Sequence, residues 1–228
     1  MIQKIIEAAL SEGRKVLNEH ESKLILAERG IPITREKVVS TKEEALEAAK
    51  EIGYPVVLKI CSHEVTHKQD FGGVHVGIED DKQLLAAYEA ISERAKAQDI
   101  EPLFLVQEMV EGGVETLVGS KKDEIFGPTI LFGLGGIFTE VLEDISLRIC
   151  PIERKDAEEM IQEIKGYKIL RGYRNVPPAD VEALVDVLLK VSELVTEHLE
   201  IKELDINPLF VRERGKGVVA ADSLIILE

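Results

Sequence analysis

Residues 62–74, with the sequence SHEVTHKQDFGGV, contain the pattern H-E-x-x-H. On a helix this pattern places two histidines on one face, where they bind zinc. Here the pattern follows the apolar run Pro55–Cys61 (PVVLKIC) within two residues, and a Gly-Gly pair comes shortly after it. Its two central residues are β-branched and form helices poorly. The continuation H-x-x-G-x-x-H, which supplies a third ligand, is absent from the sequence. We therefore interpret the stretch as a loop after a strand.

A glycine-rich loop directly after a buried strand is a candidate phosphate-binding element. Gly72 and Gly73 would let backbone N–H groups approach phosphate oxygens closely. Lys59, near the end of the preceding strand, would bring a positive charge to the same phosphates. On this segment alone, a tight turn with solvated charges is favoured, and the phosphate-binding interpretation has to be weighed with the rest of the chain.

A second group of polar residues lies where the apolar run Pro102–Val110 ends. Glu108 closes the run, and Glu115 follows just past a Gly-Gly turn. Two carboxylates at such a hinge could hold the amino group of a base and the hydroxyls of a ribose. The backbone of Met109 and Val110 could contact the edge of adenine. A solvated hinge is the alternative.

The C-terminal residues predict a hairpin that carries metal ligands. Strand alternation places Glu203, Asp205 and Asn207 on one face of residues 201–211. If the turn centres between Arg214 and Gly215, Asn207 lies directly opposite Asp222. Facing oxygen ligands, with Asp205 beside them, suit Mg²⁺, which keeps phosphate and water as its other ligands. A solvated polar face is the alternative.

Composition restricts the classes of function. The 228 residues carry a net charge of -15, so nucleic acid and anionic membranes are poor partners. No apolar run reaches the length of a membrane span, and the amphipathic N-terminus carries acids, unlike a signal peptide. The two cysteines, Cys61 and Cys150, sit in apolar runs, which predicts reduced core thiols and a cytoplasmic location. Three Asn and no Trp, with abundant Glu and Lys, are compatible with a thermophile.

The order of predicted elements indicates an α+β fold. Strands do not alternate regularly with helices, so two α+β lobes are favoured over a doubly wound parallel sheet. A capping box, Thr41-x-x-Glu44, begins one of the helices. Helices are predicted at 1–17, 20–29, 41–53, 80–98, 154–165 and 178–199. Strands are predicted at 37–39, 54–61, 73–78, 102–110, 114–119, 125–132, 201–211 and 217–227.

Taken together, these residues resemble the ATP-grasp fold. More narrowly, the chain is similar to β subunits of NDP-forming (ADP-forming) acyl-CoA synthetases, relatives of succinyl-CoA synthetase. The resemblance covers nearly the whole chain. Its specific segments are SHEVTHKQDFGGV and ELDINPL with AADS. Three further segments are shared by many ATP-grasp proteins: YPVVLKI, LVQEMVEGGVE, and LFGLGGIFTEVLED with LRICPI. It implies a nucleotide between two α+β lobes. The expected lobes are residues 23–106 and 107–228, with a helical segment, 1–22, packing on the second.

The resemblance also implies roles for individual residues. His67 matches a histidine that carries a phosphoryl group, so it would be a nucleophile and not a zinc ligand. The other expected positions are Lys59, Gly72 and Gly73 at the phosphates, Glu108, Met109, Val110 and Glu115 at adenine and ribose, and Asn207, Asp222 and Asp205 at Mg²⁺. The roles of Arg148, Arg171 and Arg174 stay open between phosphate, partner and surface contacts.

The implied reaction is acyl-CoA + ADP + phosphate ⇌ carboxylic acid + CoA + ATP, with acetyl as the family's typical acyl group. A histidine of an α subunit would pass the phosphoryl group to His67, which relays it to ADP. With 228 residues there is no room for CoA-binding and ligase domains, so we expect an α partner that holds CoA, in an α2β2 assembly. The acyl group and the choice between ADP and GDP are not indicated.

Two other functions remain as alternatives. A nucleotide-sensing ATP-grasp module would bind ATP and gate a partner without chemistry. A carboxylate–amine ligase would use ATP-grasp chemistry without needing His67.

Overall fold

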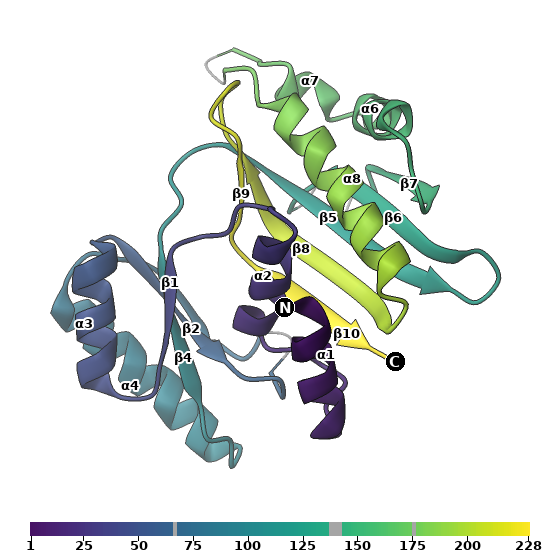
Figure 1. The fold of residues 1–228 in the computed structure, drawn as a ribbon. Helices are drawn as coiled ribbons and strands as arrows, with labels where there is room; N and C mark the ends of the chain where they lie inside the picture. Colours follow the sequence, from purple (N-terminus) through teal and green to yellow (C-terminus); the bar gives the residue numbers. More distant parts are fainter. Residues whose placement is uncertain (66–67, 137–142, 175–176) are drawn as a thin grey trace. The chain divides into compact units, whose positions relative to one another are not determined.

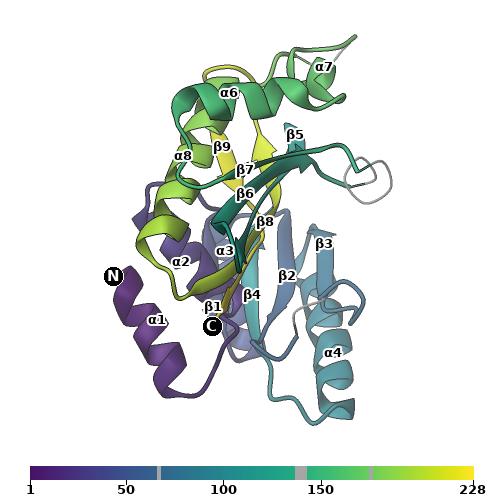
Figure 2. The same ribbon diagram turned by 90° about the vertical axis from the view of Figure 1, so that its right-hand side faces the viewer.

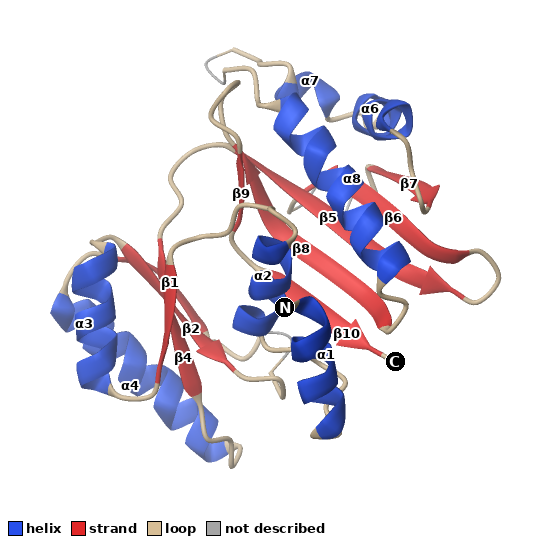
Figure 3. Cartoon of the chain, viewed as in Figure 1, coloured by secondary structure: helices blue, strands red, loops and turns tan. Residues whose placement is uncertain are grey.

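The computed structural model describes residues 1–65, 68–136, 143–174 and 177–228. The chain divides into two compact units, most of whose elements are labelled in Figure 1. Unit 1 consists of Met1–Leu17, Glu21–Ile33 and Gly112–Glu228, and unit 2 of Asn18–His20 and Thr34–Glu111. Each unit combines helices with an antiparallel sheet, as Figure 3 shows, so the predicted α+β class is confirmed.

Unit 2 contains a four-stranded antiparallel sheet with two helices on one face. Its strands are β1 (Glu36–Val39), β2 (Val56–Cys61), β3 (Val74–Ile78) and β4 (Leu103–Glu108), in the order β1-β4-β2-β3. The helices are α3 (Lys42–Ile52) and α4 (Asp81–Ala97), on the same side of the sheet (Figure 3). Leu58 and Ile60 of β2 point into the core that these helices cover, so Val57 and Lys59 occupy the opposite face.

Local signals begin both helices of unit 2. The Thr41 hydroxyl accepts a hydrogen bond from the Glu44 N–H at 3.2 Å, and the Glu44 carboxylate accepts from the Thr41 N–H at 3.2 Å. This is the capping box that the sequence predicts. Helix α4 begins after Asp80, whose carboxylate accepts from the Gln83 N–H at 2.8 Å.

Unit 1 contains a six-stranded antiparallel sheet in the order β10-β8-β5-β6-β7, with β9 paired to β8. The strands are β5 (Val114–Asp123), β6 (Gly127–Leu134), β7 (Ile145–Ile149), β8 (Ile201–Val211), β9 (Val218–Ala220) and β10 (Ser223–Leu227). The helices are α1 (Ile2–Ser11), α2 (Glu19–Glu28, whose first residues group with unit 2), α6 (Arg154–Glu163), α7 (Tyr167–Leu170) and α8 (Val181–Glu197).

The core of unit 1 lies between its sheet and its helices. Helix α8 runs along one face of the sheet, as Figures 1 and 2 show. Buried residues of α8 (Leu184, Leu188) join buried residues of β6 and β8 (Phe132, Ile206) in one hydrophobic cluster. Inward-facing positions alternate along β8, so the residues between them, including Asp205, face away from this core.

The N-terminal helix is shorter than predicted, because it ends at Ser11 where 1–17 was expected. Gly13 adopts a left-handed conformation with φ of 73°. The chain then becomes extended, and Val16 forms an antiparallel bridge with Ile226.

The compact units also differ from the expected lobes at three places, the first being residues 18–20, which group with unit 2 although the segment 1–22 was expected on the lobe 107–228. Residues 23–33 group with unit 1, because Ile25 and Leu26 of α2 lie in the hydrophobic cluster of that unit. Residues 107–111 group with unit 2, since Gln107 still pairs with Glu36 of β1.

Cys61 and Cys150 are both buried and form no disulfide, as the sequence predicts. No helix in the described ranges is both long and apolar enough to cross a lipid bilayer.

Candidate functional site

The predicted C-terminal hairpin has the register that its symmetry implies. Leu209 pairs with Ala220 on one side of the predicted ligand pair, and Ile206 pairs with Ser223 on the other. Between these pairs, the Asn207 N–H donates to the Asp222 carbonyl at 3.2 Å. Asn207 and Asp222 are therefore cross-strand neighbours in unit 1, as expected, while their role as ligands stays a prediction.

Asp205 adds a second carboxylate to this pair. Burial raises the pKa of Asp205 to about 6, and the negative charge of Asp222 contributes to the same rise. A cation bound nearby would offset the negative charge of Asp222 that disfavours ionisation of Asp205. With the Asn207 amide they form an oxygen donor set that fits Mg²⁺. Within the described residues, no three His, Cys, Asp or Glu side chains gather as a metal-binding cluster.

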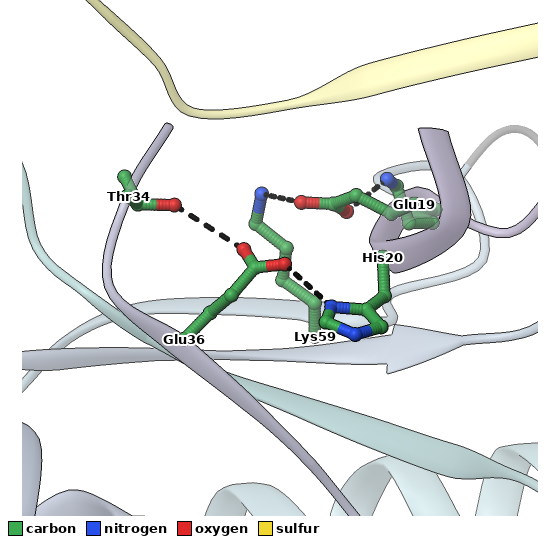
Figure 4. Close-up of polar contacts among 6 residues, drawn as sticks. Glu19, His20, Thr34, Glu36 and Lys59 are labelled. Atoms are coloured by element: carbon green, nitrogen blue, oxygen red, sulfur yellow. Dashed lines mark hydrogen bonds and ion pairs between the residues drawn. The ribbon is translucent and has the colours of Figure 1, made fainter. Parts of the chain in front are cut away.

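In unit 2, Lys59 lies on the face of β2 opposite the helices and contacts a buried acid. Its Nζ atom donates to Oε1 of Glu19 at 2.7 Å, as Figure 4 shows. Lys68 forms an ion pair with the other oxygen, Oε2, of the same carboxylate. The Glu19 side chain is 1% exposed, so one buried carboxylate joins Lys59, expected at the phosphates, to Lys68 of the following loop, which was not predicted to take part.

A second polar contact lies beside this one. The Glu36 carboxylate at the start of β1 is 2.9 Å from Nδ1 of His20 and accepts a hydrogen bond from the Thr34 hydroxyl at 3.3 Å (Figure 4). The Glu36 side chain is only 3% exposed. Strand pairing places Glu36 beside Gln107 and Gln107 beside Val57, so this contact lies on the same sheet face as Lys59.

The Gly72–Gly73 turn is folded tightly onto β2. The Gly72 N–H donates to the Gln69 carbonyl at 2.9 Å, and the Gly73 N–H donates to the Lys68 carbonyl at 2.8 Å. Both N–H groups that were expected to contact phosphate are thus used within the turn. Phosphate could bind them only if the turn exchanged these bonds.

Both positions of this turn require glycine. Gly72 has φ of 69°, a conformation that side chains disfavour. A β-carbon on Gly73 would lie 2.5 Å from Cγ2 of Ile60. Arg94 of α4 donates to the Gly72 carbonyl at 2.9 Å and holds the turn from its other side.

His67 lies outside the described residues, so its predicted role as phosphoryl acceptor stays a prediction. The residues around it, 62–65 and 68–73, form turns and irregular loop. The interpretation of the H-E-x-x-H stretch as a loop is confirmed for these residues.

At the end of β4, the Glu108 carboxylate contacts Arg35, the residue directly before β1. Its Oε1 atom accepts from the Arg35 N–H at 3.0 Å, and its Oε2 accepts from Arg35 Nε at 2.7 Å. The Met109 N–H donates to the Pro55 carbonyl at 3.3 Å. Val110 is partly exposed in the segment that follows.

Glu115 is exposed on β5, in unit 1. The predicted site residues therefore form two sets. Unit 2 holds Lys59, Gly72, Gly73, Glu108, Met109 and Val110, and unit 1 holds Glu115, Asp205, Asn207 and Asp222. Within unit 1, Asp205, Asn207 and Asp222 are neighbours, and within unit 2 the Gly72–Gly73 turn lies on the strand of Lys59. That one nucleotide binds both sets stays a prediction.

The open face of the sheet in unit 1 contains a shallow depression of about 1080 Å³. Leu131, Leu147 and Asp205 are among its lining residues, so it borders one of the predicted metal ligands. Arg148 points to the other side, where its guanidinium pairs with Glu163 and the pKa of Arg148 is raised by that contact. Arg174 lies over the Tyr173 ring, 5.3 Å from its centroid.

Sequence reasoning missed Glu19, Glu36 and Arg35. Each joins a partner far away in the chain, and Glu19 and Lys59 are 40 positions apart. No spacing rule connects such pairs. The only available signal was a group of charged residues, 18–23 (NEHESK), directly before an apolar helical stretch.

Known proteins resemble this chain over nearly its whole length. The family model of the ATP-grasp domain matches residues 8–227. The chain is 46% identical to the β subunit of ADP-forming acetate–CoA ligase II from Pyrococcus furiosus, over 99% of this chain and 97% of that one. It is 40% identical to the ADP-forming 4-hydroxybutyrate–CoA ligase of Nitrosopumilus maritimus, over 94% of this chain and 31% of that longer one.

Among solved structures, the chain is similar to dinucleotide-forming acetyl-coenzyme A synthetase 1 of Candidatus Korarchaeum cryptofilum. The TM-score is 0.87 at 40% identity, covering 100% of both chains. That protein was solved with coenzyme A and Mg-AMPPCP, and its phosphohistidine segment points towards the nucleotide-binding site.

Proposed function

Because the chain belongs to the ATP-grasp family and, within it, to the β subunits of ADP-forming acyl-CoA ligases, we propose that it binds Mg²⁺ and nucleotide and relays a phosphoryl group between a partner subunit and ADP. The complete reaction is acyl-CoA + ADP + phosphate ⇌ carboxylic acid + CoA + ATP. The observation that carries this proposal is the match to a β subunit over 99% of this chain and 97% of that relative.

His67 is the proposed phosphoryl carrier. In the direction of ATP formation, a phosphorus–nitrogen bond on a partner histidine breaks as one forms to the unprotonated imidazole nitrogen of His67. An oxygen of the ADP β-phosphate then attacks the phosphorus. The bond to His67 breaks, and the imidazole returns to its starting state. Each step exchanges one bond to phosphorus for another, so no oxidant or reductant is required.

The other residues bind and orient the nucleotide in this proposal. Lys59 neutralises phosphate charge, while Glu108 and Glu115 contact the adenine and ribose. Asp205, Asn207 and Asp222 would hold Mg²⁺, which when bound neutralises negative charge on the phosphates.

The partner is an α subunit that carries the CoA-binding and ligase domains. The longer single-chain relative, of which this chain matches 31%, supports a requirement for such additional domains. We propose an α2β2 assembly in the cytoplasm, where CoA and nucleotides are available. Acetate is the first acid to test, because the β-subunit relative is an acetate–CoA ligase.

A labelling experiment tests the relay. The chain is mixed with Mg²⁺ and γ-labelled ATP, with and without the α subunit, and protein-bound label that is acid-labile and base-stable is measured. We expect label in the wild-type chain and none in His67→Ala. His63→Ala is a matched control, because His63 is an exposed histidine of the same loop, and it should keep the label.

Other outcomes would redirect the assignment. Nucleotide binding without label under any condition would favour a regulatory module. A fully active His67→Ala enzyme would favour a carboxylate–amine ligase.

A further inference from the structure

Building on the proposed function, we infer that Glu19 is a positioning residue for the nucleotide phosphates. Its buried carboxylate holds the ammonium groups of Lys59 and Lys68 in the places where they meet the phosphates. Glu19 itself does not contact the nucleotide in this arrangement. It acts through the two lysines.

The contacts that support this inference are short and buried. Lys59 Nζ lies 2.7 Å from Oε1 of Glu19, and Lys68 pairs with Oε2. The exposed side-chain fractions are 6% for Lys59, 13% for Lys68 and 1% for Glu19. Two cations therefore share one carboxylate away from bulk water.

This arrangement holds two ammonium groups on one carboxylate. Two ammonium groups held close together repel each other, and low local polarity strengthens the repulsion. A carboxylate between them offsets this repulsion and lets both ammonium groups lie close together, where they can attract phosphate. Removal of one member of a buried ion pair leaves an uncompensated charge, so the lysines would not stay in place without Glu19.

Glu19 also connects the Gly72–Gly73 turn to the sheet. Lys59 belongs to β2, and its backbone is fixed by strands on both sides. Lys68 belongs to the turn, where its carbonyl accepts the Gly73 N–H at 2.8 Å. A carboxylate bound to both side chains holds the turn at a set position on β2.

The test compares the affinities of the purified chain for ATP and for AMP, measured by calorimetry with Mg²⁺ present. AMP lacks the β- and γ-phosphates, so the affinity ratio reports their contribution alone. We expect Glu19→Gln to reduce this ratio about tenfold, which is the factor that one charged hydrogen bond contributes, while AMP affinity changes little. Glu21→Gln, on the same helix and paired with Arg14 at 2.9 Å, should keep the wild-type ratio.

A double-mutant cycle tests whether Glu19 acts through Lys59. Adding Glu19→Gln to Lys59→Met should lower the ratio by less than Glu19→Gln does alone, because only the part exerted through Lys68 remains. If Glu19→Gln fails to fold by circular dichroism, Glu19→Asp carries the test. It keeps the charge but shortens the side chain, and should lower the ratio by a smaller factor.

Two kinds of result would contradict these proposals, and they can be told apart. An unchanged or increased ratio in Glu19→Gln, or additive losses with Lys59→Met, would overturn the positioning role alone. A wild-type chain that does not distinguish ATP from AMP would overturn the proposed function, and the positioning role with it.

Discussion

The Asn207 N–H donates to the Asp222 carbonyl at 3.2 Å, which fixes these two residues as direct neighbours across the C-terminal hairpin. The register is the same on either side of them, so the pairing follows from the turn and not from a local irregularity. Asp205, two residues before Asn207, is near enough to Asp222 that their charges interact. The hairpin thus places two carboxylates and an amide in one region of unit 1.

Asp205→Asn should stabilise the metal-free protein at alkaline pH. Burial and Asp222 raise the pKa of Asp205 to about 6 from its ordinary value of 3.8. The proton binds the folded state more tightly, so its stabilising effect is complete below pH 3.8 and is lost as the pH rises through about 6. We expect Asp205→Asn to raise the free energy of unfolding at pH 8 by about 2 kcal/mol, measured by urea denaturation.

The same variant should lose the response to Mg²⁺. A cation that binds the folded state stabilises it by mass action, so Mg²⁺ should raise the urea midpoint of the wild type at pH 8 and leave that of Asp205→Asn unchanged. Glu203→Gln, on the same strand and paired with Lys121 at 3.1 Å, is the control that should still respond. A destabilised Asp205→Asn at pH 8 without Mg²⁺ would contradict the assigned burial effect.

Gly73→Ala should disrupt the Gly72–Gly73 turn. The added β-carbon would lie 2.5 Å from Cγ2 of Ile60, so the turn or the strand must move. We expect a loss of about 1–3 kcal/mol in unfolding free energy and a weaker affinity for ATP, measured by denaturation and calorimetry.

Ile60, whose side chain the new β-carbon would strike, provides the control for Gly73→Ala. Ile60→Ala alone should be destabilising, because it removes a fully buried side chain. It also removes the methyl group that the new β-carbon of Gly73→Ala would strike, so the double variant should lose less than the sum of the single losses. Strictly additive losses would show that Gly73 is not constrained by Ile60.

Parts of the fold were predictable because they depend on short-range rules. The hairpin register follows from the turn position and the alternation of β8, and both can be read from residues 201–227. The capping box at Thr41 begins α3 where the sequence predicts it. Such features need only residues that are close in the chain.

Strand β7 was not predicted, and its orientation explains why. Ile145, Leu147 and Ile149 face outward at this sheet edge, whereas Ser146 and Arg148 point inward and contact Glu163 of α6. This alternation is opposite to the usual pattern of apolar residues facing the core.

Likewise, the contacts of Glu19 depend on tertiary packing, which brings a helix start onto a sheet face. A single sequence contains no rule that pairs an acid with lysines of a distant loop. The residues of the candidate site could therefore be predicted by type, but their supporting partners could not.

Asp180→Ala should weaken the fold without affecting phosphoryl transfer. One Asp180 oxygen accepts from the Ala183 N–H at 3.4 Å, and the other accepts from the N–H groups of Gly215 and Gly217 at 2.9 and 2.8 Å. The carboxylate thus caps α8 and ties it to the β8–β9 turn. We expect a loss of about 1–3 kcal/mol in unfolding free energy, measured by urea denaturation.

The control for Asp180 lies on the same helix. Asp186→Asn alters an exposed acid that is 3.6 Å from Arg154, and it should change the unfolding free energy by less than about 0.5 kcal/mol. Label on the protein at saturating ATP should equal the wild-type level in both variants. Reduced label in folded Asp180→Ala would show that the cap affects the site.

Glu108→Gln should weaken nucleotide binding more than it weakens the fold. Its partner Arg35 has a side chain that is 65% exposed, so their ion pair contributes at most about 1 kcal/mol to stability. If Glu108 binds the nucleoside, Glu108→Gln should lower the affinity for ADP and the affinity for adenosine by similar factors, measured by calorimetry. The contact that is lost does not involve phosphate. Arg35→Ala is the control, since it removes the partner and keeps the carboxylate. Equal losses of affinity in both variants would indicate that the Arg35 contact, and not Glu108 itself, shapes this part of the site.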